Sequence, residues 1–342
     1  MGRVVEVTVV LAILTVLKVS EAVDDKPPFT LNIFKTGKYP TTFIQLDESS
    51  PSTPPKPLRI YSPDQLPGNF PVLLFLHASC LENSYYSKIL QFVSTHGYIV
   101  IAPQLYMCQV FGNPISGTDE VKYAAEVVNW LPKYLQSVLP STSKANLDMF
   151  TLGGHGRGAK TSFAMAITQG FDVDIAAVLA LDPVAGLGKG NEDEPRILTY
   201  LPRSFKLTIP NTVIGTGLGN QTICALICPA CAPNDMNHVE FYRETTPPTS
   251  HIVITDYGHV DMLDDDLDGT MGFIAQHKCV NGDPNKNQIR TTVAGIMAAF
   301  LNAYFSSFDG DYMTILHKPE VTPVAIDTPE FILDEDVAYA QF

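Results

Sequence analysis

The fold is decided by residues 148–166, which read DMFTLGGHGRGAKTSFAMA. Apolar residues predict a short buried strand over 148–153, and the small side chains of 157–166 predict a helix. Gly154 and Gly156 lie between them and Gly158 follows at the start of the helix, which indicates a tight turn. A strand that turns directly into a helix is the building unit of sheets made from parallel strands.

The same unit carries the nucleophile of many hydrolases, in the pattern G-x-S-x-G. Here the central residue is Gly156. Such a turn holds its central residue at positive φ, which costs a non-glycine residue roughly 1–3 kcal/mol and glycine almost nothing. The sequence therefore indicates a serine-hydrolase scaffold that lacks the attacking oxygen. The alternative is an ordinary glycine-rich turn.

Further strands and helices alternate around this unit. Apolar runs without alternation predict strands that are buried on both faces, and helical patterns fall between and after them. We therefore expect an α/β protein with the α/β-hydrolase fold, in which helices cover both faces of a mostly parallel, doubly wound sheet. The predicted strands are 71–77, 98–103, 176–183, 212–217 and 251–255, and the predicted helices 81–95, 118–138 and 287–305.

Composition divides the chain into four parts. Residues 1–22 resemble a signal peptide, because a basic start and a short apolar run precede Ser20-Glu21-Ala22, so we expect a secreted protein. An uncleaved anchor is the alternative, and no other stretch is apolar and long enough to span a membrane. Residues 23–57 are predicted to form an N-terminal extension with β-like pieces such as 30–34, and 58–306 the hydrolase domain.

Residues 307–342 are predicted to form an acidic C-terminal tail. From 309 onward, eight acidic residues accompany one basic residue, Lys318. This composition favours a solvated tail, and the alternative is a segment that folds back over the mouth of the site.

The net charge of −14 argues against several partners. A protein this acidic is repelled by phosphate backbones and by anionic membranes, so nucleic acid is excluded as a partner.

Six cysteines in an exported chain predict disulfides, and fifteen pairings are open. The pair Cys228 and Cys231 has C-x-x-C spacing, but only His238 lies near as a further ligand, so a structural role is favoured over zinc. Asn220 begins a glycosylation sequon, Asn220-Gln221-Thr222.

Two later residues can complete a catalytic triad in the order nucleophile, acid, base. Asp182 follows the first strand after the glycine turn, and His259 follows the strand at 251–255. Both fall at the carboxyl ends of strands, where open α/β sheets place their sites. Taken alone, Asp182 would be a helix cap and His259 a loop histidine.

Together these residues resemble the plant-type chlorophyllases, α/β-hydrolases that remove the phytyl ester of chlorophyll. The resemblance covers about 60–305. It rests on FLH (75–77), STHGYIVIAPQLY (94–106), VNWL (128–131), QSVLP (136–140), GHGRGAKT (154–161), LDPV (181–184), GTGLG (215–219), NHVEF (237–241) and DYGHVDMLDD (256–265).

The resemblance implies roles for these positions. The family's nucleophile falls on Gly156, its acid on Asp182 and its base on His259, although a second aspartate of the family falls on Ala185. It places the oxyanion donors at the amides of Arg157 and of Ala78 or Ser79. The family has glycine where this chain has Ala78, so ordinary ester hydrolysis is in doubt. No cofactor and no metal are implied.

Part of a calcium-loop pattern is also present. Asp264, Asp266, Asp268 and Gly269 match its start, but Ala275 stands where the closing glutamate belongs, so we expect no metal there.

Three functions remain open. The favoured one is a binding protein without hydrolase activity that holds a bulky apolar ester or acid, such as a chlorophyll-derived tetrapyrrole. The second is an ester hydrolase that uses water activated by His259, or a relocated nucleophile at Ser79 or Cys80. The third is an extracellular structural or matrix protein.

Overall fold

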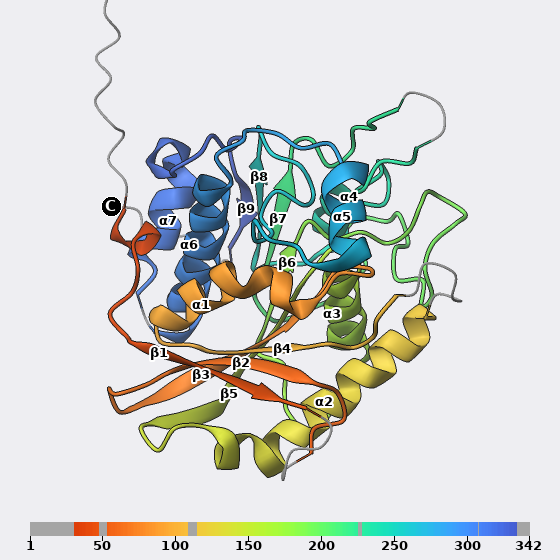
Figure 1. Cartoon of the computed structure of the whole chain (residues 1–342). Coiled ribbons are helices and arrows are strands. Elements are labelled where there is room, and N and C mark those ends of the chain that lie inside the picture. Colours follow the sequence, from red (N-terminus) through yellow and green to blue (C-terminus); the bar gives the residue numbers. More distant parts are fainter. Residues whose placement is uncertain (1–30, 48–52, 109–114, 225–227, 307, 334–342) are drawn as a thin grey trace, which may run out of the picture.

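The computed structural model describes residues 31–47, 53–108, 115–224, 228–306 and 308–333. The predicted signal peptide lies outside these residues. The described chain folds around one nine-stranded sheet (Figure 1). From edge to edge the strands are β1 (Thr41–Leu46), β2 (Leu58–Pro63), β4 (Ile99–Pro103), β3 (Gly68–Leu76), β5 (Ser143–His155), β6 (Ala177–Leu181), β7 (Asn211–Thr216), β8 (Thr249–Ile254) and β9 (Glu330–Ile332).

The six central strands, from β4 to β8, are parallel to one another. Antiparallel strands close both edges, with β1 and β2 on one side and β9 on the other. The predicted mostly parallel sheet is therefore confirmed. Because parallel strands share one direction, the ends of β5, β6 and β8 that carry the predicted site residues lie at the same edge.

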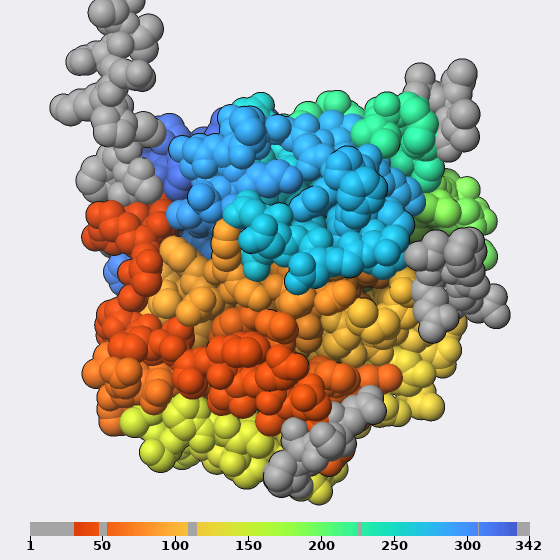
Figure 2. Space-filling view, in the orientation of Figure 1, coloured from red at the N-terminus to blue at the C-terminus, as the bar shows by residue number. Residues whose placement is uncertain are grey.

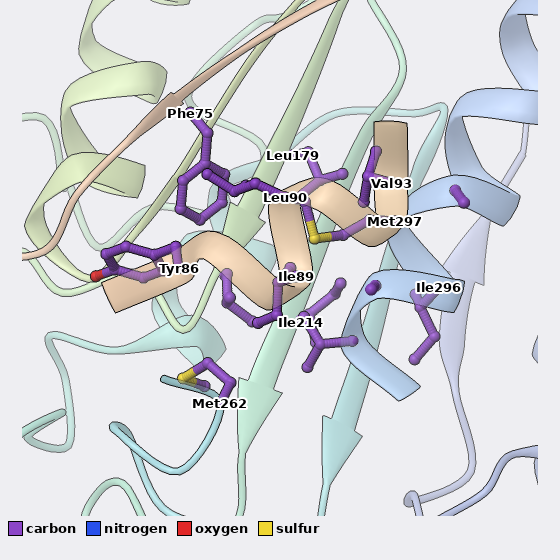
Figure 3. Packing of buried hydrophobic residues seen from close by; sticks show 14 of the residues in the cluster. Phe75, Tyr86, Ile89, Leu90, Val93, Leu179, Ile214, Met262, Ile296 and Met297 are labelled. Carbon is purple, nitrogen blue, oxygen red and sulfur yellow. The ribbon is translucent and has the colours of Figure 1, made fainter. Parts of the chain in front are cut away.

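Helices cover both faces of the sheet, because alternate residues of each strand point to opposite sides. On one face Leu73 and Phe75 of β3 pack against two helices, and Figure 3 shows this packing around Ile89, Leu90 and Val93. On the other face Val72 and Leu74 pack against a third helix. The first face carries α1 (Ser87–Thr95) and α6 (Lys286–Phe305), and the second α2 (Gly117–Val138), α3 (Arg157–Thr168) and α4 (His238–Glu244).

Helix α5 (Gly269–Lys278) lies beside the segment that contains α1, near the predicted site. The Tyr85 hydroxyl donates to the carbonyl of Asp268, and Lys88 pairs with Asp265. In Figure 2 these orange and cyan segments meet on the visible face. No helix among the described residues is long and apolar enough to cross a membrane.

The predicted N-terminal extension is part of the folded sheet. Its residues 41–46 form β1, which pairs with β2 over its full length. The expected β-like piece at 30–34 is wrong, because Asn32–Phe34 is a short 3-10 helix. The reason is packing: Phe34 lies against Gly295 of α6, where an added Cβ would come within 2.3 Å of the ring.

The interpretation of the C-terminal region as a solvated tail is wrong for residues 308–333. They form α7 (Gly310–His317), which packs on α6, and strand β9, which pairs with β8. Tyr312, Ile315 and Leu316 are buried, at the spacing of a helical stripe. The sequence did not indicate this stripe, because acidic residues dominate the composition of the region. Residues 308–333 extend the β8 edge and contribute no residue to the predicted site, so folding over the mouth is wrong for them as well. Residues 334–342 of the predicted tail lie outside the described residues.

Ile315→Ala should therefore destabilise the whole domain, by about 2–5 kcal/mol, because it removes a fully buried side chain. The matched control is Glu320→Gln, which changes an exposed residue of the same region and should alter the free energy of unfolding by less than about 0.5 kcal/mol. Denaturant unfolding measures both. Equal denaturant midpoints of unfolding for the two variants would instead support the prediction that this region is a solvated tail.

Candidate active site

A sharp turn joins β5 to α3 at Gly156. This residue has φ 55° and ψ −119°, which is a strained combination for any other residue. The turn is also tight: a Cβ on Gly158 would lie 2.3 Å from the carbonyl oxygen of Leu76. The amide of Gly156 donates to Leu181 at 3.0 Å, which ties the turn to the end of β6. Backbone conformation at position 156 and close packing at position 158 therefore favour glycine, whatever its role in function.

Asp182 and His259 are joined, as the sequence predicts. His259 Nδ1 lies 2.7 Å from Asp182 Oδ2, and Thr216 donates to the same carboxylate from its amide (3.2 Å) and its hydroxyl (2.7 Å). Burial raises the pKa of Asp182, but the hydrogen bond and charge of His259 and the bond from Thr216 outweigh burial and hold this pKa at about 2. A charged acceptor at Asp182 requires a proton on Nδ1, so Nε2 is the nitrogen that faces the site.

The loop that presents His259 is held by Asp261, which the sequence analysis missed. Its carboxylate accepts from the amides of Gly258 and Gly282, each at 2.7 Å, and pairs with Lys286 at 3.3 Å. This buried carboxylate therefore positions the histidine. Its only sequence signal is its place two residues after His259.

His259 points at Gly156. A Cβ built on Gly156 would lie 3.2 Å from His259 Nε2 and 3.0 Å from the Cβ of Ala78. The distance to Ala78 is shorter than an ordinary contact between carbon atoms, which is about 3.5–4.0 Å. Ala78 therefore fills part of the space that a side chain at position 156 would need.

The predicted oxyanion donors differ in availability. Arg157 is the first residue of α3, so its amide has no partner within the helix. The amide of Ala78 donates to the hydroxyl of Tyr86 at 3.1 Å, which leaves Ser79 as the better second donor. The oxyanion role itself stays a prediction for Arg157 and Ser79.

A second network lies behind the predicted triad, and the sequence analysis missed it. The Tyr86 hydroxyl forms a 2.9 Å hydrogen bond with His155 Nδ1. The ring centroids of His155 and His259 lie 4.3 Å apart. Burial, with the charge of His259 added, holds the pKa of His155 well below its usual range. His155 is therefore neutral, and it links Tyr86 to the back of the His259 ring.

The side chain of Arg157 anchors the turn to α2. Its guanidinium pairs with Glu120 at 2.9 Å and with Asp193 at 3.7 Å, and it donates to the carbonyl of Ile115 at 3.0 Å. Burial raises the pKa of Glu120, and the charge of Arg157 opposes that effect. Because the guanidinium is engaged in this way, Arg157 offers a ligand mainly its backbone amide.

A cavity of about 370 Å³ opens in front of this site. Most of its lining is apolar, including Leu81, Val184 and Ile274, and four polar groups face it: Ser79, Arg157, Lys278 and His259. Asp193 also reaches the rim. A separate hollow of about 340 Å³ beside Tyr39 and Phe305 contains none of the predicted site residues.

Disulfides border the cavity. Two of them have cysteines in its lining, Cys80 bonded to Cys108 and Cys231 bonded to Cys279. A third, which is not in the lining, joins Cys224 to Cys228. The C-x-x-C cysteines therefore have structural roles in separate bridges. The relocated nucleophile at Cys80 is wrong, because its sulfur is in a disulfide and has no thiol to attack with. The exposed Ser79 hydroxyl lies 4.0 Å from that sulfur.

Two other predicted features lie outside the cavity. Asn220 is exposed in a turn, where its side chain donates to Asn234 at 3.0 Å, so glycosylation stays a prediction. In the acidic run, Asp265 pairs with Lys88 and Arg290, and the Asp264 carboxylate accepts from the amide of Lys88. Among the described residues, no three His, Cys, Asp or Glu side chains gather to hold a metal.

Comparisons with known proteins agree with this arrangement. The family model "Chlorophyllase" matches residues 29–333. Chlorophyllase-1 of Arabidopsis thaliana is 42% identical over 320 residues, which cover 90% of this chain and 97% of that protein. "Chlorophyllase-1, chloroplastic" of Citrus unshiu is 43% identical, covering 89% of each chain, and chlorophyllase-2 of Arabidopsis thaliana is 40% identical, covering 88% of this chain and 98% of its own. The chain therefore belongs to the chlorophyllase family, whose fold is that of the α/β-hydrolases.

Proposed function

We propose that this chain is a chlorophyllase relative without serine-esterase activity, which uses its cavity to bind a bulky apolar ligand. The observation that carries the proposal is Gly156, which occupies the elbow position while His259 and Asp182 remain aimed at it. Loss of an elbow nucleophile costs on the order of 10⁶ in rate in a serine hydrolase. The binding surface does not depend on that oxygen.

The cavity supports a ligand with a large apolar part. Its volume is near the lower end of the range of about 300–1,000 Å³ that ligand sites span. It accommodates an ester or acid group and the atoms next to it, while the rest of a larger ligand extends over the rim past the exposed Leu187. The names of the relatives suggest a chlorophyll-derived tetrapyrrole or its ester.

We further propose that the protein is secreted and glycosylated at Asn220. The support is the apolar segment at the start of the sequence, the six cysteines paired in disulfides and the exposed sequon. One relative is described as chloroplastic, so a fluorescent fusion to the full chain should be followed in plant cells. Signal from chloroplasts rather than the secretory route would contradict this part.

The protein purified from the culture medium should show no covalent labelling by a serine-directed fluorophosphonate and no esterase turnover above that of His259→Ala, because no elbow oxygen is present. Absorption and mass spectrometry of the same sample should detect a co-purified pigment or apolar ester. Turnover that His259→Ala abolishes would establish hydrolysis through an activated water, and labelling mapped to Ser79 would establish a relocated nucleophile. Either result would overturn the proposal.

A further inference from the structure

His259 Nε2 is a polar atom with no protein acceptor or donor recorded among the described residues, although the side chain is about nine-tenths buried. In a working triad this nitrogen bonds the nucleophile hydroxyl. Here it faces the bare Cα of Gly156 and the cavity instead. This nitrogen is therefore free to bond a group that enters the cavity.

The same corner of the cavity favours negative charge. The amide of Arg157 begins the 12-residue helix α3, whose N-terminus carries a partial positive charge. Lys278 reaches the cavity from α5, and the one carboxylate at the rim, Asp193, is paired with Arg157. Because Glu120 and Asp193 both pair with Arg157, Lys278 is the cationic side chain of the described lining that is left to attract an anion.

We propose that the part of the cavity in front of Gly156 is a carboxylate site, in which the head of an apolar carboxylic acid accepts hydrogen bonds from Nε2 of protonated His259 and from the amide of Arg157. This inference rests on the proposed function, because it names the chemical class of the ligand that the cavity binds. An ester offers only a carbonyl oxygen to the same donors. The acid should therefore bind more tightly than its own ester.

Binding takes up one proton. A neutral His259 directs a lone pair at the ligand, so the complex contains one proton more than the free protein and the free carboxylate together. That proton lies between Nε2 and the carboxylate, and Asp182 balances the charge of the imidazolium through Nδ1. Affinity should therefore rise as the pH falls.

The other ionisable groups around His259 do not share this proton. Asp182 stays charged because its pKa is about 2, and burial keeps His155 and His238 neutral by lowering their pKa values. On the loop of His259 itself, Asp261 is paired with Lys286. The charged groups that face the cavity from other elements are Arg157, Lys278 and Asp193. His259 is left as the group whose charge changes on binding.

Isothermal titration of the full chain with decanoate, methyl decanoate and decanol tests the proposal at about pH 5.5 and 8, in buffers of different ionisation enthalpy. Decanoate should bind roughly tenfold to hundredfold more tightly than the ester and the alcohol at the lower pH, as expected for a hydrogen bond to a charged group. The buffer dependence should report the uptake of about one proton.

Two variants and a control sharpen the result. His259→Gln should abolish both the preference for the acid and the proton uptake. Lys278→Gln should weaken decanoate binding at both pH values but keep the proton uptake, and it remains informative if His259→Gln does not fold. His277→Gln changes an exposed histidine of the same helix α5 and should bind like the unaltered protein.

Equal affinity for decanoate and methyl decanoate, without pH dependence, would overturn the carboxylate site and leave a general apolar binder. Binding of none of the three compounds would overturn the carboxylate site and the proposed function together. Hydrolysis of methyl decanoate would overturn only the proposed function, since decanoate itself still reports on the carboxylate site.

Discussion

The double variant Gly156→Ser, Ala78→Gly is expected to show measurable esterase activity, well above that of either single variant. The proposed acid and base are positioned for this reaction, since Asp182 bonds His259 and Nε2 faces position 156. Triad members act as a unit, so a serine at the proposed nucleophile position can recover much of a loss on the order of 10⁶.

The second substitution is needed because the two positions touch. A Cβ at 156 lies 3.0 Å from the Cβ of Ala78, so serine alone displaces either the turn or the loop that carries Ser79. A misplaced oxyanion donor costs about 10²–10³ in rate. The effects of substitutions at residues in direct contact are not additive, so the rate gain of the double variant should exceed the product of the two single gains.

Hydrolysis of a short-chain ester and fluorophosphonate labelling at position 156 measure this rescue. The triple variant that adds His259→Ala is the control and should be inactive. Gly156→Ser should also lower the free energy of unfolding by about 1–3 kcal/mol, because serine adopts φ 55° less readily than glycine. A double variant that folds and binds ligand but hydrolyses nothing would show that the site differs from an esterase by more than one oxygen.

The free energy of unfolding is expected to fall steeply as the pH drops from about 6.5 to about 4. Burial lowers the pKa of His77 and of His238 to about 4, against an ordinary value of 6.5. In this window the unfolded chain binds protons that the folded chain excludes, so stability is complete above the ordinary value and is lost below it. Each histidine contributes about 3 kcal/mol, together a large share of a typical total of 5–15 kcal/mol.

The contacts of these histidines explain why they stay neutral. The amide of Leu105 donates to His77 Nε2 at 3.1 Å, and a protonated ring cannot accept that bond. His238 shares a 2.8 Å hydrogen bond with His251, which contacts Glu330 of β9, so protonation there also acts on the β8 edge. The lowered pKa of Asp182 affects stability only from pH 3.8 down to about 2, below this window.

Denaturant unfolding at several pH values between 8 and 4.5 measures the slope. His238→Gln should reduce it, whereas His277→Gln, which removes an exposed histidine, should leave it unchanged. An unfolding free energy that stays constant from pH 8 to 5 would contradict the assignment of neutral, buried histidines.

Much of the site could be predicted because its signals are local. The strand that ends at His155, the turn at Gly156 and the helix from Arg157 are adjacent in the chain, and each pattern depends only on its neighbours. Asp182 and His259 were found by the same rule, because each directly follows an apolar strand and parallel strands bring such ends together.

The missed residues lack local signals. Nothing in the sequence around Tyr86 shows that its hydroxyl reaches both Ala78 and His155, since these contacts cross from the segment before α1 to two separate strand ends. The pairing of Cys231 with Cys279 spans 48 residues and was one of fifteen open combinations. In the C-terminal region, the composition was dominated by exposed acids, while the few apolar residues that dock α7 decided the fold.

The sequence by itself determined the mostly parallel sheet, the absence of a side chain at position 156 and the candidate acid and base, because periodicity and strand ends are properties of short segments. Only the tertiary structure decided that Ala78 occupies the space beside Gly156, that Tyr86 takes the amide of Ala78 and that Cys80 is no free thiol. These facts depend on close packing between segments far apart in the chain, where a shift of less than 1 Å separates contact from clash.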